Sequence, residues 1–341
     1  MLPPTALAEI PEYCRQCPIL YIQGRNLHLT PKQIADYSVY LLVRLLICLV
    51  QALPLGVCHV LSQHLGRFCW EVLRFRRQVI DENLRIAFPE KKQSERNEIA
   101  LQMWQHLLLM LVEIAHAPRK IKRTTWRHYS NLPDSKEMLL RLMDERPLVI
   151  ISGHLGNFEI GGYLLALHGF PTHTVARALD NPYLDAFVNN FRGSTGQFML
   201  TKQGSGGQIT KILNQGGTLV LLGDQFAGQN GCWVEFFGRA ASTHKAVSVF
   251  TLGSEAPTAV SSALRREGPL TIEMQVADIV DPRNADFELK TIPLLTEWFT
   301  KHLESMIRQA PEQYWWVHRR WKGHPDDRKH RRQRKRQQQA A

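Results

Sequence analysis

The chain has 341 residues, 44% of them hydrophobic, and a formal net charge of +11. Ten basic and two acidic residues lie between positions 319 and 341, so this end carries eight of the eleven net charges. The length fits one large α/β domain with an extension. The six scattered cysteines exclude a disulfide-rich secreted scaffold and are typical of a reducing compartment.

Residues 1–36 show no clear hydrophobic period and are expected to be an irregular N-terminal segment. Cys14 and Cys17 form a lone CxxC with no second cysteine pair after it, which favours incidental thiols over a zinc or redox site. Prolines and an acidic residue before position 18 do not fit a signal peptide.

Residues 37–80 are predicted to be a membrane-associated helical segment. Its apolar stretch, Tyr40–Leu61, has 22 residues and would measure about 33 Å as one helix, close to the thickness of a bilayer core. Arg44 lies near one end of the stretch, where its side chain can reach the interface. A buried or amphipathic helix is the alternative interpretation. Helices are also predicted at 81–88, before Pro89, and from Ser94 to about Ala115.

From Arg146 onward, apolar strands alternate with helical stretches, which indicates an α/β fold with helices flanking a central sheet. A short turn joins the last two strands, so we expect a mixed sheet. The predicted strands are 148–152, 172–177, 218–222, 257–264 and 270–280, and the predicted helices are 158–168, 182–191, 207–214, 243–252 and about 292–307. Residues 81–322 are expected to form this domain, followed by a basic, disordered tail at 323–341.

Polar residues follow several of the predicted strands. His154 comes after strand 148–152, with Glu159 five positions on, and a histidine beside a carboxylate can act as a general base. A purely structural role for this pair remains open. Arg177 ends the next strand, and Arg192 ends the following helix; either is suited to binding phosphate or carboxylate, or is a surface residue.

Asp224 follows strand 218–222, where an acid can serve catalysis or cap a turn. The sequence has no GxGxxG, no Walker lysine, no GxSxG and no zinc-type cluster, so we expect no nucleotide cofactor, no serine hydrolase and no metal. Gly204–Gly207 precedes a helix and is interpreted as a helix start.

Taken together, seven segments of the chain resemble the family of bacterial lipid A secondary acyltransferases, within the lysophospholipid acyltransferase-like superfamily. The resemblance spans about Tyr37 to Lys322. Its pieces are the leucine-rich segment with Pro54-Leu55, Asn83–Pro89, His154-x4-Glu159, Val175–Arg177 with Asn181-Pro182, Gly223-Asp-Gln225, Phe236–Thr243 and Pro311–Trp321.

The resemblance implies a membrane-bound O-acyltransferase with a glycerolipid acyltransferase-like fold. It would move a fatty acyl group from acyl carrier protein or acyl-CoA to a hydroxyl group of a lipid A precursor. His154 would be the general base assisted by Glu159, while Arg177, Arg192 and Asp224 would bind substrate. It also implies the cell inner membrane, with the catalytic domain on the cytoplasmic side.

Two other functions stay open at this point. One is acylation of a different membrane lipid, such as a lysophospholipid or a mannolipid. The other is a non-enzymatic basic protein that binds membranes through its C-terminal tail; specific binding of nucleic acid is not expected.

Overall fold

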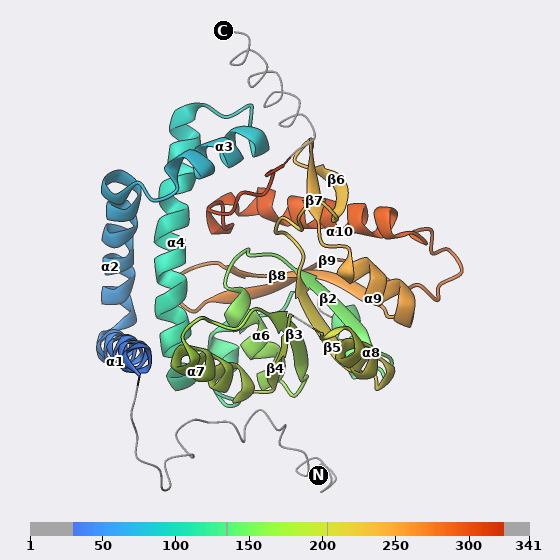
Figure 1. Cartoon of the computed structure of the whole chain (residues 1–341), viewed down its shortest axis with the longest axis horizontal. Helices are drawn as coiled ribbons and strands as arrows, with labels where there is room; N and C mark the ends of the chain where they lie inside the picture. The colour runs from blue at the N-terminus through green and yellow to red at the C-terminus, as the bar shows by residue number, and fades with distance from the viewer. Residues whose placement is uncertain (1–29, 134–135, 203, 324–341) are drawn as a thin grey trace, which may run out of the picture.

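The computed structural model describes residues 30–133, 136–202 and 204–323, so residues 1–29, the CxxC and nearly all of the basic tail lie outside these ranges. Residues 31–36, which were predicted to be irregular, instead form the first turns of helix α1 (Pro31–Ala52). A seven-stranded mixed sheet forms the centre of the fold, in the order β1-β9-β8-β2-β5-β3-β4. All its pairs are parallel except β8 with β9. The predicted mixed α/β fold is therefore confirmed (Figure 1).

The strands are β1 (Ser130–Asn131), β2 (Leu148–Ser152), β3 (Thr172–Ala176), β4 (Gln197–Thr201), β5 (Thr218–Leu222), β8 (Thr258–Arg265) and β9 (Ile272–Val280), and a separate hairpin joins β6 (Cys232–Phe236) to β7 (Arg239–Thr243). The helices are α1 (Pro31–Ala52), α2 (Leu55–Phe68), the π-helix η3 (Cys69–Leu73), α3 (Arg77–Ala87), α4 (Gln93–Lys120), η4 (Trp126–His128), α5 (Lys136–Met143), α6 (Phe158–Leu167), α7 (Pro182–Gly193), α8 (Gly206–Asn214), α9 (Ala246–Ser254), α10 (Ile292–Gln309) and η5 (Pro311–Gln313).

The central strand β2 shows why both faces of the sheet are covered. All five of its residues are buried. Side chains of a strand alternate between the two faces, and Val149 and Ile151 belong to the core formed with α8, α9 and α10, whereas Leu148 and Ile150 pack towards α6. A short, wholly apolar run is typical of such a doubly covered parallel strand.

The predicted elements need several corrections. The apolar stretch Tyr40–Leu61 does not form one helix, because Pro54 lacks an amide hydrogen and separates α1 from α2. The strands β1 and β4, the helix α5 and the β6–β7 hairpin were not predicted.

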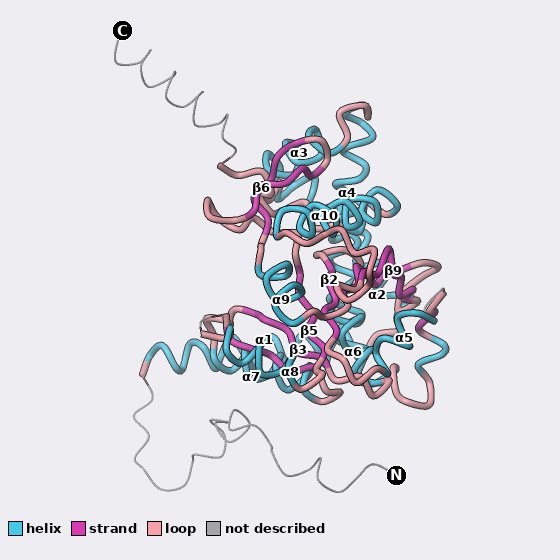
Figure 2. Tube along the Cα trace, turned by 90° about the vertical axis from the view of Figure 1, so that its right-hand side faces the viewer, coloured by secondary structure: helices cyan, strands magenta, loops and turns pink. Residues whose placement is uncertain are grey.

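Two helices among the described residues are long and apolar enough to cross a membrane, α1 and α4. They differ in their surroundings: α4 is partly buried against the body, whereas α1 has no buried residue. Figure 1 shows α2 beside α4, with α1 at the lower end of α2, and Figure 2 shows α1 lying next to α7.

Candidate active site

His154 and Asp224 meet because they occupy equivalent positions after two neighbouring parallel strands. The register of β2 and β5 pairs Ser152 with Leu222, so the residues two positions further on lie side by side at the carboxyl edge of the sheet. Ligands of open α/β sheets bind at this edge. Gly153 permits the close approach, because a Cβ there would lie 3.3 Å from Cγ of Asp224.

The Asp224 carboxylate accepts two hydrogen bonds from His154. Nδ1 of the ring lies 2.8 Å from Oδ1, and the backbone N–H donates to Oδ2 at 2.9 Å. Burial of Asp224 raises its pKa, but His154 outweighs this effect through its charge and both hydrogen bonds and lowers the pKa to about 2. Asp224 is thus an ionised, buried acceptor that keeps a proton on Nδ1 and leaves a lone pair on Nε2.

Aromatic residues flank the imidazole of His154. The ring centroids of Phe158 and Trp315 each lie 5.1 Å from it, and the backbone N–H of Trp315 donates to the carbonyl of His154 at 3.0 Å. The His154 side chain is only 14% exposed. The backbone and the two neighbouring rings therefore hold the imidazole in place, and Nε2 is the ring nitrogen that Asp224 does not contact.

The segment after η5 closes the site from the other side. Burial raises the pKa of the Tyr314 phenol well above its usual range, and the neighbouring Asp224 carboxylate raises it further. Burial lowers the pKa of His318 to about 4, and its Nε2 accepts the backbone N–H of Phe226 at 3.0 Å. Arg320, which is 2% exposed, donates to the carbonyl of Ser242. The phenol of Tyr314 keeps its proton and Nε2 of His318 is occupied by the Phe226 N–H, so His154 is the base best placed to act.

A buried ion pair supports the loop that carries His154. Glu113 accepts two hydrogen bonds of 2.6 Å from Arg265, and Nδ2 of Asn157 donates to the same carboxylate at 2.9 Å. Burial, with the charge of Arg265, lowers the pKa of His106 to about 3. Its Nδ1 accepts a hydrogen bond from Arg265 at 2.7 Å, so the ring proton lies on Nε2, which donates to the carbonyl of Gly156 at 3.2 Å. The network holds both backbone and side chains at 156–157 and so fixes the turn before α6.

Glu159 lies in a different contact from the one the sequence predicts. It sits in the first turn of α6, as cooperation with His154 would require, yet its carboxylate forms a bidentate ion pair with Arg192 of α7. The carboxylate in contact with His154 belongs to Asp224, which was predicted to bind substrate. The partner of the histidine is thus corrected, while a catalytic contribution of Glu159 stays a prediction.

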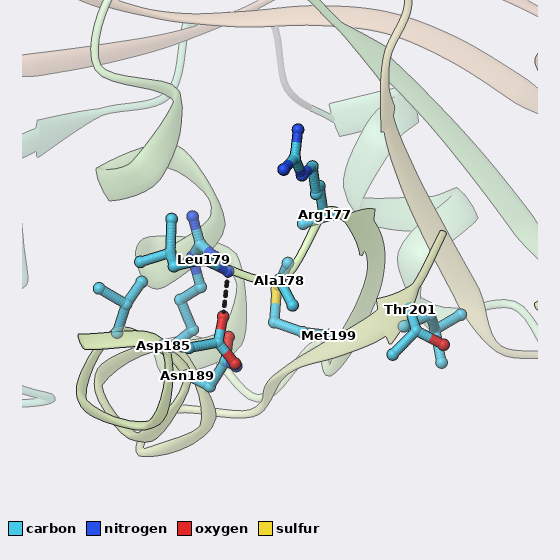
Figure 3. A pocket seen from close by; sticks show the side chains of 11 residues that line it. Arg177, Ala178, Leu179, Asp185, Asn189, Met199 and Thr201 are labelled. Atoms are coloured by element: carbon cyan, nitrogen blue, oxygen red, sulfur yellow. Dashed lines mark hydrogen bonds between the residues drawn. The ribbon is translucent and has the colours of Figure 1, made fainter. Parts of the chain in front are cut away.

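Arg177 and Arg192 line one pocket beyond the ends of β3 and β4 (Figure 3). Arg192 is oriented by Glu159, whereas the Arg177 side chain is 79% exposed and forms a surface ion pair with Asp180 at 3.0 Å. The backbone N–H of Leu179 donates to Asp185 at 2.8 Å and closes one wall. Asp224 does not line this pocket. The structure thus separates the His154–Asp224 pair from the arginine-lined pocket.

No role was predicted for five residues around His154: Gln225, Tyr314, Trp315, His318 and Arg320. All five belong to segments that carry the family resemblance, but their contacts with the site depend on the fold. No group of three or more histidine, cysteine, aspartate or glutamate side chains that could hold a metal occurs within the described residues.

Comparisons with known proteins show the family of this chain. The family model for bacterial lipid A biosynthesis acyltransferases matches residues 29–323. The lipid A biosynthesis lauroyltransferase of Escherichia coli (strain K12) is 25% identical over 285 residues, covering 82% of this chain and 89% of the relative. The palmitoleoyltransferase of the same strain is 24% identical over 291 residues, covering 80% and 87%.

Among solved structures, the 1-acyl-sn-glycerophosphate acyltransferase of Thermotoga maritima aligns with a TM-score of 0.36 and 10% identity. The alignment covers 77% of this chain and all of that one.

Proposed function

The chain belongs to the bacterial lipid A biosynthesis acyltransferase family, and on this premise we propose that it transfers a fatty acyl group from an acyl thioester to a hydroxyl group of a lipid A precursor. The observation that carries the proposal is the His154–Asp224 pair, in which Nδ1 of the histidine lies 2.8 Å from a buried, ionised carboxylate. The family match supports the substrate class, and the pair supports the mechanism.

In the proposed reaction, Nε2 of His154 takes the proton of the acceptor hydroxyl as its oxygen attacks the thioester carbonyl. Asp224 stabilises the imidazolium that forms, because its negative charge lies 2.8 Å from Nδ1. The C–S bond then breaks, and the imidazolium returns the proton to the leaving thiolate. The products are an ester and a free thiol, and no covalent enzyme intermediate is needed.

The arginine-lined pocket supports an anionic acceptor. Arg192 is held by Glu159, and Arg177 is exposed at the pocket entrance, where its partner Asp180 is itself 91% exposed and easily displaced. A guanidinium binds phosphate oxygens in pairs. We propose that this pocket binds a phosphate of the acceptor while an acceptor hydroxyl reaches His154. In this arrangement Glu159 contributes by orienting Arg192.

The apolar surface of α1, α2 and η3 supports attachment to a membrane. Seventeen of the twenty-five exposed large apolar side chains of the described residues lie between Ile34 and Phe75. Leu42, Leu45 and Leu49 of α1 are each more than half exposed. A patch of this kind on a soluble surface would be an aggregation site, whereas a bilayer would bury it.

The contacts of α1 support an orientation along the membrane surface instead of across it. Tyr37 packs against Tyr183 of α7 with ring centroids 5.2 Å apart, and Gln51, near the other end, donates to the carbonyl of Ala115 in α4 at 2.6 Å. Both ends of α1 are thus tied to the catalytic body. A spanning α1 would draw α4 and α7 into the hydrocarbon, so we propose that α1 lies in one interface.

The base assignment is tested by acyl transfer to a purified lipid A precursor, with acyl carrier protein and CoA thioesters as alternative donors. His154→Ala should abolish transfer, and replacement of the exposed His128 by alanine is the matched control. Retained transfer in His154→Ala would refute the base assignment. Lysophosphatidic acid and a mannolipid are run as competing acceptors, and preference for either would overturn the lipid A assignment.

The membrane face is tested by flotation with anionic vesicles. Leu45→Glu should lower the bound fraction, while Leu294→Glu, at an exposed apolar position of α10, should not. Orientation is tested with single cysteines at Lys32 and Pro54 and an impermeant maleimide. Labelling of both from the same side supports the in-plane helix, and labelling from opposite sides contradicts it.

A further inference from the structure

The side chain of Gln225 contacts Nε2 of His154, the nitrogen that is proposed to take the proton. Its Nε2 atom lies 3.1 Å from Nε2 of His154. Because Gln225 follows Asp224 directly, consecutive residues after β5 contact the two opposite nitrogens of one imidazole ring. The Gln225 side chain is only half-buried, so it has room to move away from the ring.

The direction of this hydrogen bond follows from the two atoms that meet. The amide nitrogen of Gln225 can only donate, so Nε2 of His154 accepts with its lone pair, while Nδ1 donates to the Asp224 carboxylate. A lone pair requires an N–H donor, which the carboxamide of Gln225 supplies. The contact thus engages the electron pair that would take the proton of an acceptor hydroxyl.

We propose that Gln225 is a gate on His154, which covers Nε2 until the acceptor hydroxyl displaces the amide. The inference rests on the proposed acyl transfer, in which Nε2 is the base. Phe158 and Trp315 flank the ring and Asp224 holds its other nitrogen, so the amide is the contact that a substrate must replace.

The gate would favour transfer over hydrolysis of the thioester. Water at Nε2 would give its proton to the histidine and attack the carbonyl. The C–S bond would then break, and the thiolate would take the proton from the imidazolium, which releases a fatty acid and a thiol. A glycolipid hydroxyl is held in place by its other contacts and can displace the amide, whereas a single water gains only one hydrogen bond in exchange for another.

The gate is tested with Gln225→Ala and Gln225→Asn, whose amide is one methylene too short to reach the ring. The matched control is Gln208→Ala, at an exposed position of α8. The first measurement is the amount of free fatty acid released per acyl group transferred. The second, without any substrate, is the rate at which diethyl pyrocarbonate modifies His154, determined by mass spectrometry relative to the exposed His128.

Both Gln225 variants should raise the hydrolysis-to-transfer ratio and the relative modification rate of His154 about fivefold, the change expected for loss of one ordinary hydrogen bond. Gln208→Ala should change neither. A folded Gln225→Ala or Gln225→Asn variant with an unchanged modification rate would overturn the gate. If the wild-type enzyme failed to acylate the lipid A precursor, the proposed function would fail, while the modification rate would still report on the gate.

Discussion

Replacement of Asp224 by asparagine separates the His154–Asp224 pair from the His154–Glu159 pair that the sequence predicts. Asparagine keeps the size of the side chain, but it has one acceptor oxygen where the carboxylate has two. The Asp224 carboxylate accepts from both the backbone N–H and Nδ1 of His154. In Asp224→Asn one donor loses its partner, or the ring changes tautomer so that Nε2 carries the proton and cannot accept another.

The expected loss follows from these two bonds. A hydrogen bond to a charged group contributes about 1.5–3 kcal/mol, so weakening both amounts to roughly 3–6 kcal/mol. At about 1.4 kcal/mol per factor of ten, kcat should fall by roughly 10²–10⁴. The depressed pKa of Asp224, about 2 instead of 3.8, corresponds to ~2 kcal/mol in favour of the ionised carboxylate.

The measurement is kcat and KM for acyl transfer to the lipid A precursor, with the donor saturating. Asp286→Asn, at an exposed position after β9, is the matched control and should retain wild-type values. Circular dichroism and the melting temperature confirm that the variants are folded. KM should change little, because Asp224 lies outside the arginine-lined pocket.

Two results would refute the reasoning. If Asp224→Asn kept more than a third of the wild-type kcat while His154→Ala lost all activity, Asp224 would not set the tautomer. If Glu159→Gln lowered kcat further than Asp224→Asn, with KM unchanged, Glu159 would be the working partner of His154 in solution.

Three further predictions concern the support of the site. Glu159→Gln and Arg192→Gln should each raise KM. The loss of kcat/KM in the double variant should be smaller than the sum of the two single losses by ~1–2 kcal/mol, because the two side chains form one ion pair. Additive losses would contradict this. Gly156→Ala should lower the free energy of unfolding by ~2 kcal/mol or more in urea denaturation, because its φ is +64° and the new Cβ would lie 2.0 Å from the carbonyl oxygen of Ala263; a stable variant would contradict it. Burial and the charge of Arg265 lower the pKa of His106 to about 3, so its contribution to stability is complete above about pH 6.5 and is lost as the pH falls towards 3. Urea unfolding between pH 7.5 and 4.5 should show a loss of roughly 1 kcal/mol per pH unit that His106→Gln reduces, and an equal slope in both proteins would refute it.

The sequence predicts the central strands β2 and β5 well because each is a short apolar run, fully buried in β2 and alternately buried and half-buried in β5. Strands 148–152 and 218–222 match β2 and β5 at both ends. The edge strand β4 was missed because only one of its residues is buried and its polar ends, Gln197 and Thr201, give no continuous apolar run. The β6–β7 hairpin was missed because of its turn. Phe237 and Gly238 adopt positive φ angles there, but they lack the Asn-Gly or Asp-Gly sequence that is typical of such turns.

The partner of His154 was beyond the sequence pattern because it depends on strand order. Proximity in sequence favoured Glu159, five positions away, whereas Asp224 is seventy positions away and becomes a neighbour only when β2 and β5 pair. One local signal did exist. Each of the two strands is followed by a glycine and then a polar residue, Gly153-His154 after β2 and Gly223-Asp224 after β5.

The position of Glu159 also has a physical reason. The Glu159 side chain, in the first turn of α6, contacts Arg192 in the last turn of α7 and not His154. An unpaired carboxylate there would be costly at 17% exposure, and the bidentate guanidinium removes that cost. A histidine and a glutamate with this spacing can therefore both matter for one reaction through separate contacts: His154 with Asp224 for the proton, and Glu159 with Arg192 for the anionic acceptor. Kinetics can distinguish the two roles, because the first pair should act on kcat and the second on KM.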